Sequence, residues 1–277
     1  MKWRIFHLIA LAAAPALMAA GGGQTEVRKP AADAARVGQQ ALRTDGMPKA
    51  IIIPHSSSVN FSTTMSVFVW IKTTDTSHNT GIFAKSNYTQ AKRCWGIETW
   101  DHGRRLLALL SDNGRTIQSI YGDTVINDGQ WHHVGWTYAA GKVELYVDKR
   151  METKTFLTNH RPIPSLNQEA ATAVTIGSLL NGDKPTLSIA GTIFRPIAIN
   201  KALSQAEVDE LYDLDFAGSR DPTRLSFWSD VKLSARFSAG SVHDDTANGN
   251  QAAFSGGEFQ FVDDLPGRSS TGTERPR

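Results

Sequence analysis

The stretch DGQWHHVGWTYAAGKVELYVD, residues 128–148, decides the fold. Its first residues predict a turn, because Gly129 can take the positive φ that a tight turn needs. Along the following strand, successive side chains alternate between two faces. One face carries His132, Val134, Trp136 and Tyr138, and the other carries Trp131, His133, Gly135 and Thr137. A second turn at Ala140-Gly141 leads into Val143–Val147, so the stretch predicts a β-hairpin with one apolar face.

Short β-rich runs separated by turn residues continue on both sides of this hairpin. They are Ala50–Ile53, Ser66–Lys72, Gly81–Ala84, Trp95–Trp100, Leu106–Leu110, Thr116–Ile120, Ala173–Ile176 and Ser188–Asn200. Ser66–Lys72 is apolar on both faces, which predicts a central strand that is covered on both sides. Many short strands at this spacing indicate a sandwich or jelly roll and not βαβ units.

One helix is predicted after these strands. Ser204 and Glu207 form a capping box, in which the serine hydroxyl accepts from the glutamate N–H and the carboxylate reaches back. The helix should end by about Asp215. Beyond it, Leu225–Trp228 and Phe254–Val262 are more weakly β-like.

The hairpin is similar to the signature hairpin of laminin G-like jelly-roll domains, and the match in order and spacing extends over residues 41–215. The residues that carry the structural signature are Trp70, Asp128, Gly129, Trp131, His132, His133 and Trp136. The resemblance implies an all-β, two-sheet antiparallel jelly-roll β-sandwich of the concanavalin A-like type, with one short C-terminal helix. Residues 225–228 and 245–257 resemble the segment that usually opens such a domain, although here they follow the helix.

The chain is expected to divide into a signal peptide at 1–21, a linker at 22–40, the domain at 41–263 and a disordered tail at 264–277. Lys2 and Arg4 precede an apolar run, Ile5–Ala20, which is short for a membrane span of about 20 residues. We therefore expect a secreted, periplasmic or cell-surface protein with no membrane span in the mature chain.

Charge and cysteine content exclude some classes of function. The net charge is only +2 over 277 residues. This small value argues against nucleic-acid binding, which requires a dense basic face. Cys94 is the single cysteine, so an intramolecular disulfide is impossible, and a small buried hydrophobic residue is the expected role. The oligomeric state stays open.

No catalytic constellation is present, so the chain is predicted not to be an enzyme. His132 and His133 point to opposite faces of one strand and cannot share a metal ion. Glucan hydrolases of this fold carry a strand with the pattern E-x-D-x-x-E, and this sequence does not contain that pattern. Glu98 has no acidic partner at those spacings. The acidic residues between Asp209 and Asp215 are expected to form a solvated helix face.

Calcium is disfavoured as a cofactor, and no other cofactor is expected. The resemblance implies a calcium site built from Asp45 and from an acidic pair whose positions are Phe194 and Arg195 in this chain. Calcium takes about six to eight oxygen ligands, and Asp45 alone cannot supply them.

The predicted ligand contacts are Trp95, Trp100, Asp101 and His102, since sugars stack on aromatic faces that have polar groups beside them. Trp95 and Trp100 have opposite parity, so at most one points inward. The primary hypothesis is a non-catalytic binding domain for a glycan or protein ligand. A structural or adhesive component of a cell surface or virion is the alternative, and a glycoside hydrolase of the same fold is third.

Overall fold

The computed structural model describes residues 39–88, 91–139, 141–152, 156–158, 163–169, 171–216 and 221–267, with the main chain alone at 156–158. The predicted signal peptide, most of the linker and most of the tail lie outside these residues. In the part of the chain that is described, no helix is long and apolar enough to cross a membrane.

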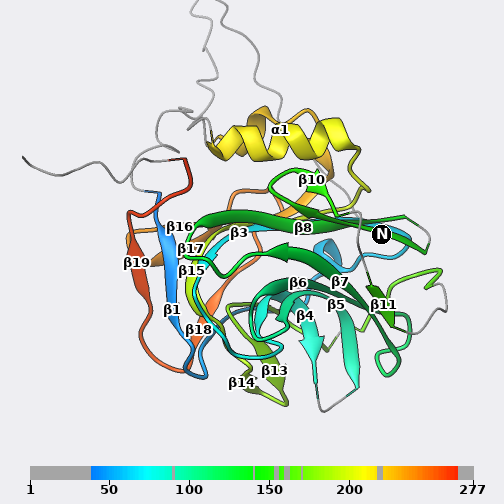
Figure 1. Ribbon diagram of the computed structural model, residues 1–277, viewed down its shortest axis with the longest axis horizontal. Helices are drawn as coiled ribbons and strands as arrows, with labels where there is room; N and C mark the ends of the chain where they lie inside the picture. Colours follow the sequence, from blue (N-terminus) through cyan, green and yellow to red (C-terminus); the bar gives the residue numbers. More distant parts are fainter. Residues whose placement is uncertain are drawn as a thin grey trace, which may run out of the picture.

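Two sheets pack face to face and enclose the main hydrophobic core (Figure 1). The described strands pair antiparallel, apart from one contact of β13 with β4 and an isolated parallel bridge between Gly81 and Ser188. The nine-stranded sheet contains β1 (Ala41–Asp45), β3 (Thr64–Thr73), β8 (Trp131–Ala139), β9 (Lys142–Val147), β10 (Arg150–Met151), β15 (Ala190–Ile199), β16 (Val231–Ser238), β17 (Ser241–Asp244) and β19 (Gln260–Val262). The ten-stranded sheet contains β2 (Ala50–Ile53), β4 (Gly81–Asn87), β5 (Lys92–Trp100), β6 (Arg105–Ser111), β7 (Ile117–Val125), β11 (Phe156–Thr158), β12 (Val174–Ile176), β13 (Leu179–Asn181), β14 (Lys184–Thr186) and β18 (Ala253–Ser255). The expected jelly-roll β-sandwich is confirmed.

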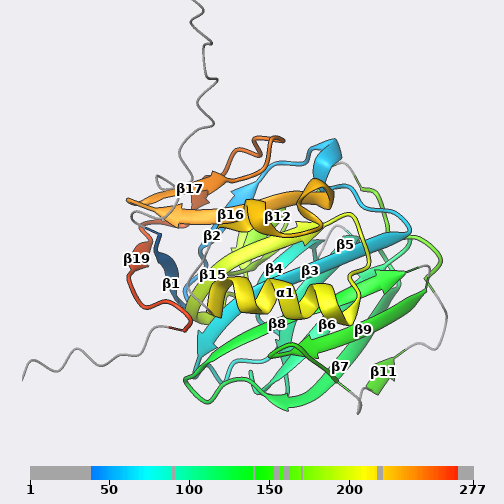
Figure 2. The same cartoon turned by 90° about the horizontal axis from the view of Figure 1, so that it is seen from above.

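Strand β3 is covered on both faces, as its sequence predicts. Val67, Val69 and Ile71 point into the core between the sheets. Phe68 and Trp70 point the other way, toward helix α1 (Gln205–Phe216), which crosses the outer face of the nine-stranded sheet (Figure 2). Here "outer" means the face of a sheet that points away from the other sheet.

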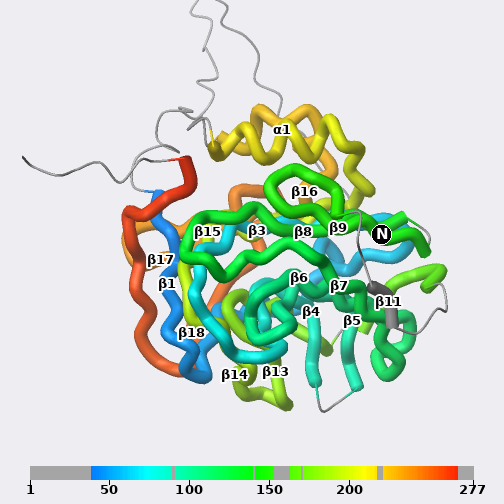
Figure 3. The backbone as a smooth tube through the Cα atoms, viewed as in Figure 1, coloured from blue at the N-terminus to red at the C-terminus, as the bar shows by residue number. Residues whose placement is uncertain are grey.

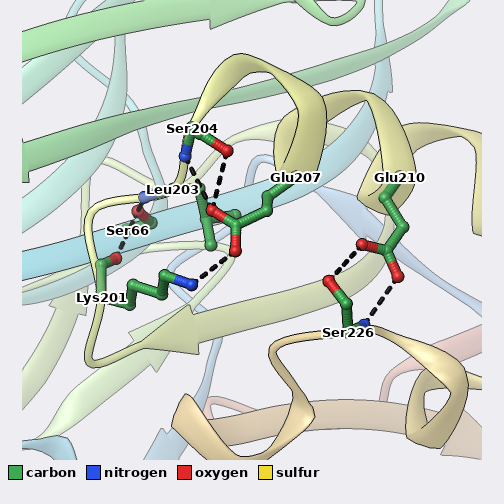
Figure 4. A network of polar contacts seen from close by, with 7 residues as sticks. All are labelled: Ser66, Lys201, Leu203, Ser204, Glu207, Glu210 and Ser226. Carbon is green, nitrogen blue, oxygen red and sulfur yellow. Dashed lines mark hydrogen bonds and ion pairs between the residues drawn. The ribbon is translucent and has the colours of Figure 1, made fainter.

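The N-terminus of α1 is capped by a carboxylate. The backbone N–H of Ser204 donates to Glu207 Oε2 at 2.9 Å, and the Ser204 hydroxyl donates to the same oxygen (Figure 4). Only half of the expected capping box is therefore present, because the serine hydroxyl is a donor here and does not accept from the Glu207 N–H. Lys201 pairs with the other carboxylate oxygen, and Ser66 Oγ links Lys201 O to the Leu203 N–H.

The acidic residues of α1 do not all form a solvated face. Asp213 pairs with Lys149 at the surface, and the Glu210 carboxylate accepts two hydrogen bonds from Ser226 (Figure 4). Asp215, however, is fully buried, and the prediction of a solvated side chain is wrong there. It lies in the turn of the helix that faces the sheet, where a cation is available to neutralise it.

The segment after α1 completes both sheets. Strand β16 pairs with β15, β18 pairs with β2, and β19 pairs with β1, so the red C-terminal strand runs beside the blue N-terminal strand in Figure 3. The expectation of a β-like run at Leu225–Trp228 is wrong. Two short 3-10 helices, Pro222–Arg224 and Trp228–Asp230, flank this position, and the strand begins at Val231.

The last described strand, β19, lies beside the first, β1. The side chains of Gln40 and Asp263 are hydrogen-bonded, and Gln40 also forms a bridge with Phe237. The two ends of the fold therefore lie side by side.

The folded region extends past the boundary expected at residue 263. Leu265 is 1% exposed and packs with Trp70 and Phe194, while Asp264 pairs with Lys72. At the other end, Gln39 is also buried. The described domain thus begins two residues earlier, and continues at least four residues further, than the sequence indicates.

Trp136 is predicted to be a major source of stability. Its ring is fully buried between the sheets, and its indole N–H donates to Gly96 O at 3.0 Å. Trp136→Ala should lower the free energy of unfolding by about 3–5 kcal/mol. Trp131→Ala, at a partly exposed position on the opposite face, should cost clearly less. Urea denaturation of the two variants measures the difference, and equal losses would contradict this account of the hairpin.

The closeness of the two ends predicts that the domain tolerates circular permutation. We expect a chain that starts at residue 221, joins residue 267 to residue 39 through a short Gly/Ser linker and ends at residue 216 to fold into the same sandwich. A domain whose two ends lie close together commonly tolerates circular permutation without loss of its core. Circular dichroism and a cooperative thermal transition are the measurements. A permuted chain without cooperative unfolding would show that the present order is required.

Candidate functional site

The two tryptophans of strand β5 have opposite environments, as their parity predicts. Trp95 is 1% exposed and lies in the core between Phe61 and Phe83, with ring centroids 6.1 and 5.3 Å away. It is therefore not accessible to a ligand at the surface. Trp100 is partly exposed at the end of the strand, on the outer face of the ten-stranded sheet. Of the predicted contacts, Trp100, Asp101 and His102 stay accessible.

Trp100 belongs to a small aromatic and charged surface. The Trp100 and Tyr121 rings pack edge to face, with their centroids 4.7 Å apart. Arg105, opposite Trp100 on β6, places its guanidinium 5.8 Å from the indole centroid and forms an ion pair with Asp123. Such an arrangement offers apolar ring surface with polar groups at its border. We call Trp100, Tyr121, Arg105, Asp101 and His102 the Trp100 patch.

The turn beside Trp100 holds Asp101 and His102 in fixed positions. Asp101, His102 and Gly103 have φ values of 49°, 56° and 76°. Only glycine fits at the third position, because a Cβ there would lie 2.1 Å from Asp75 O. The Asp101 carboxylate lies 3.3 Å from Arg105 Nε, and the His102 N–H donates to His78 Nδ1. The loop at 75–78 therefore supports the turn.

Tyr121 and Arg105 are members of the patch that the sequence analysis missed. Both are separated from Trp100 along the chain and approach it only through the pairing of β5, β6 and β7. The alternation of Ile120 and Tyr121 does show that one of the two points outward. It does not show that Tyr121 meets Trp100.

Glu98 lies two residues before Trp100 on the same face and is almost fully buried. Burial raises the pKa of its carboxyl to about 8, opposed only by the charge of Arg93. Glu98 Oε1 and Trp100 Nε1 have no hydrogen-bond partner among the described residues. The neutral, protonated form of the carboxyl is therefore favoured at pH 7. Glycoside hydrolysis needs a second carboxyl within about 5–9.5 Å, and the charged group that acts on Glu98 is an arginine instead.

The two histidines of the signature hairpin occupy different faces, as predicted. His133 is buried under α1 against Phe68 and Trp70, and burial lowers its pKa to about 3. His132 lies between two carboxylates: Nδ1 is 2.8 Å from Asp148 and Nε2 is 3.1 Å from Asp128. Both histidines are structural in these positions.

The positions that the resemblance connects with calcium are engaged in other interactions. Asp45 pairs with Lys49 at 2.8 Å, and this hydrogen bond lowers the pKa of Asp45. Phe194 packs with Trp70, and Arg195 Nε donates to Asp215 Oδ1 at 2.8 Å. Among the described residues, no group of three or more His, Cys, Asp or Glu side chains could hold a metal ion. Cys94 is buried and free, as expected from the sequence.

Residues 45–209 match the family described as the concanavalin A-like lectin/glucanases superfamily. This match covers more than half of the sequence, and the chain belongs to that superfamily. A comparison with curated proteins finds no match.

Solved structures share the fold at low sequence identity. A protein of Bacteroides ovatus, described as carbohydrate binding, has a TM-score of 0.56 and 13% identity over 83% of this chain and 61% of its own. This chain thus spans less than two thirds of that protein. The heptameric SAP-like pentraxin of Limulus polyphemus has a TM-score of 0.44 and 17% identity, over 76% of this chain and 96% of that one. The CBM40 of Ruminococcus gnavus IT-sialidase, bound to α2,3-sialyllactose, has a TM-score of 0.47 and 11% identity, over 62% and 98%. At these identities, likeness shows the fold alone.

The pair of carboxylates around His132 predicts a pH-dependent stability. Burial alone would lower the pKa of His132, but its hydrogen bonds and charge contacts with Asp148 and Asp128 raise it above 6.5. The protonated form is therefore favoured in the folded state. This contribution is fully present below the unfolded pKa and is lost as the pH rises through the folded pKa.

His132→Gln should consequently cost more stability at pH 6, where protonation of the wild-type imidazole is favoured, than at a pH above the raised pKa of the folded state. Thermal midpoints of the variant and the wild type across this range provide the measurement. His243→Gln, at an exposed position, is the control. A pH-independent difference would show that His132 stays neutral between the two carboxylates.

Proposed function

We propose that this chain is a non-catalytic binding domain that recognises a glycan through the Trp100 patch. The observation that carries the proposal is the partly exposed indole of Trp100, bordered by Tyr121 and by the charged groups of Arg105, Asp101 and His102. Sugar rings present apolar C–H faces and hydroxyl edges, so they match an aromatic surface with polar groups at its border. Membership in a superfamily of lectins and glucanases supports a sugar ligand.

Among the described residues, Arg93 is the charged group that acts on the pKa of Glu98, and this supports binding over hydrolysis. A retaining or inverting glycosidase needs one acid and one base or nucleophile on either side of the scissile bond. Glu98 provides a single neutral carboxyl that is 1% exposed. We propose that it supports the patch from below and takes no part in bond cleavage.

We further propose that the domain works outside the cytoplasm, in the periplasm, at the cell surface or in the medium. The apolar run Ile5–Ala20 behind Lys2 and Arg4 supports this location. A protein ligand is the alternative to a glycan at the same patch.

Structural assembly is the second candidate function, and one observation favours it. Phe254 is 45% exposed and packs with Phe259 and Phe261 at the edges of both sheets. Exposed aromatic clusters of this kind can mediate self-association. Stable oligomers without any glycan binding would favour this candidate.

Trp100→Ala should abolish or weaken glycan binding by about tenfold or more, since a stacking aromatic contributes roughly 1–3 kcal/mol. A glycan array identifies the ligand of the full chain, and isothermal titration measures the affinity of the variant. Trp228→Ala is a matched control, because Trp228 is also partly exposed but packs beside α1. Unchanged affinity in Trp100→Ala would refute the patch. The lack of any glycan ligand for the wild type would refute the function.

A further inference from the structure

Five side chains form a single row across the outer face of the nine-stranded sheet. The registers place Gln260 opposite Arg43, Arg43 opposite Thr192, Thr192 opposite Lys72 and Lys72 opposite Trp131. The neighbouring row contains Phe194 and Trp70, which α1 and Leu265 cover. The first row borders the part of the sheet that α1 and Leu265 cover. We call these five residues the Arg43 row.

Two cavities flank Arg43. One, of about 380 Å³, is lined by Arg43, Thr192, Lys72, Thr73, Gly191 and Asp264 among others. The other, of about 500 Å³, lies toward Lys49, Asp45, Glu258 and Gln260. The first has the volume of a small ligand site, and the second extends the depression on the other side of the arginine.

The charges of the two cavities differ. The second contains Arg43 and Lys49 together with Asp45 and Glu258, and Lys49 already pairs with Asp45. The first contains Arg43, Lys72 and only one carboxylate, Asp264, which pairs with Lys72 at 2.8 Å. Within the described part of the chain, Arg43 forms no hydrogen bond or ion pair and is exposed. Arg43 lines both cavities, so its formal charge is offset by Glu258 over the two together, but its guanidinium has no ion-pair partner within hydrogen-bond distance among the described residues.

A guanidinium group is suited to an oxyanion. Its planar fork can donate two parallel hydrogen bonds to one carboxylate or sulfate group, which is more specific than a lysine contact. Asp264 is held by two residues of the row. One of its oxygens pairs with Lys72, and the other accepts a hydrogen bond from Trp131 Nε1 at 3.1 Å. This bond holds the partly exposed Trp131 ring at the far end of the row.

The floor of the first cavity is open and has few competing acceptors. The Thr73 hydroxyl donates to Ala190 O at 2.6 Å, and the Thr44 hydroxyl donates to Gly191 O at 3.2 Å. These carbonyl groups are therefore already engaged. A Cβ at Gly191 would lie 2.9 Å from Lys72 O, so glycine allows β15 and β3 to approach closely here.

We propose that the cavity between β1, β15 and β3 binds the carboxylate or sulfate group of an acidic sugar residue, with Arg43 as the direct contact and without calcium. The proposal rests on the proposed glycan function, but it concerns a second site. The Trp100 patch lies on the outer face of the other sheet, so the two sites can be tested separately.

Isothermal titration of the full chain with trigalacturonic acid tests a carboxylate ligand, and a heparin-derived tetrasaccharide tests a sulfate ligand. Maltotriose is the neutral comparison. We expect at least one acidic oligosaccharide to bind, equally well in EDTA and in calcium, and maltotriose not to compete for this site. Arg43→Gln should weaken the binding by about tenfold or more, which is the size of a charged hydrogen bond.

Lys49→Gln is the matched control, because Lys49 is a nearby cation that already pairs with Asp45. It should change the affinity by less than about twofold, and Trp100→Ala should also leave acidic-sugar binding unchanged. Unaltered binding in Arg43→Gln, or no binding of either acidic probe to the wild type, would overturn this site. Loss of neutral-glycan binding in Trp100→Ala would still support the proposed function in that case.

Discussion

The buried carboxylate of Asp215 fixes the helix on the sandwich, and much of the outer surface depends on this contact. Arg195 Nε donates to one oxygen and Trp70 Nε1 donates to the other, so a helix residue is bonded to two strands of the sheet. A charge in this position needs such partners, because breaking a buried pair typically costs about 3–5 kcal/mol. With α1 held here, Trp70, Phe194 and His133 are covered, and the Arg43 row becomes the border of the open sheet.

The same interaction determines what the side chain at position 195 does. Arg195 has a φ of 45° in the irregular part of β15, between Phe194 and Ile197. This backbone directs its guanidinium toward Asp215, under the helix. The resemblance places an acidic side chain at position 195. In this chain a cation stands there and is used for helix attachment, which leaves Asp45 to pair with Lys49.

The hairpin, strand β3 and helix α1 could be predicted because each has a pattern that lies within a few residues. The signature at 128–148 and the capping residues Ser204 and Glu207 are examples. Strand β16 was missed, although Val231, Leu233, Ala235 and Phe237 alternate with polar residues and provide a period-2 signal. The resemblance of Leu225–Trp228 to an opening strand predicts a strand six residues too early, since β16 begins at Val231. Which strands this segment joins depends on β15 and β1, and local patterns do not contain that information.

The sites show the same limit more strongly. Parity separates Trp95 from Trp100, but the contact of Trp100 with Tyr121 requires the registers of three strands. The Arg43 row joins residues 43, 72, 131, 192 and 260, which only the pairing of five strands brings together. Leu42 and Ile97 point into the shared core, so Arg43 and Trp100 face opposite directions on different sheets. One sugar residue cannot reach both. The two proposed sites would therefore select their ligands by different chemistry, ring stacking on one sheet and charge on the other.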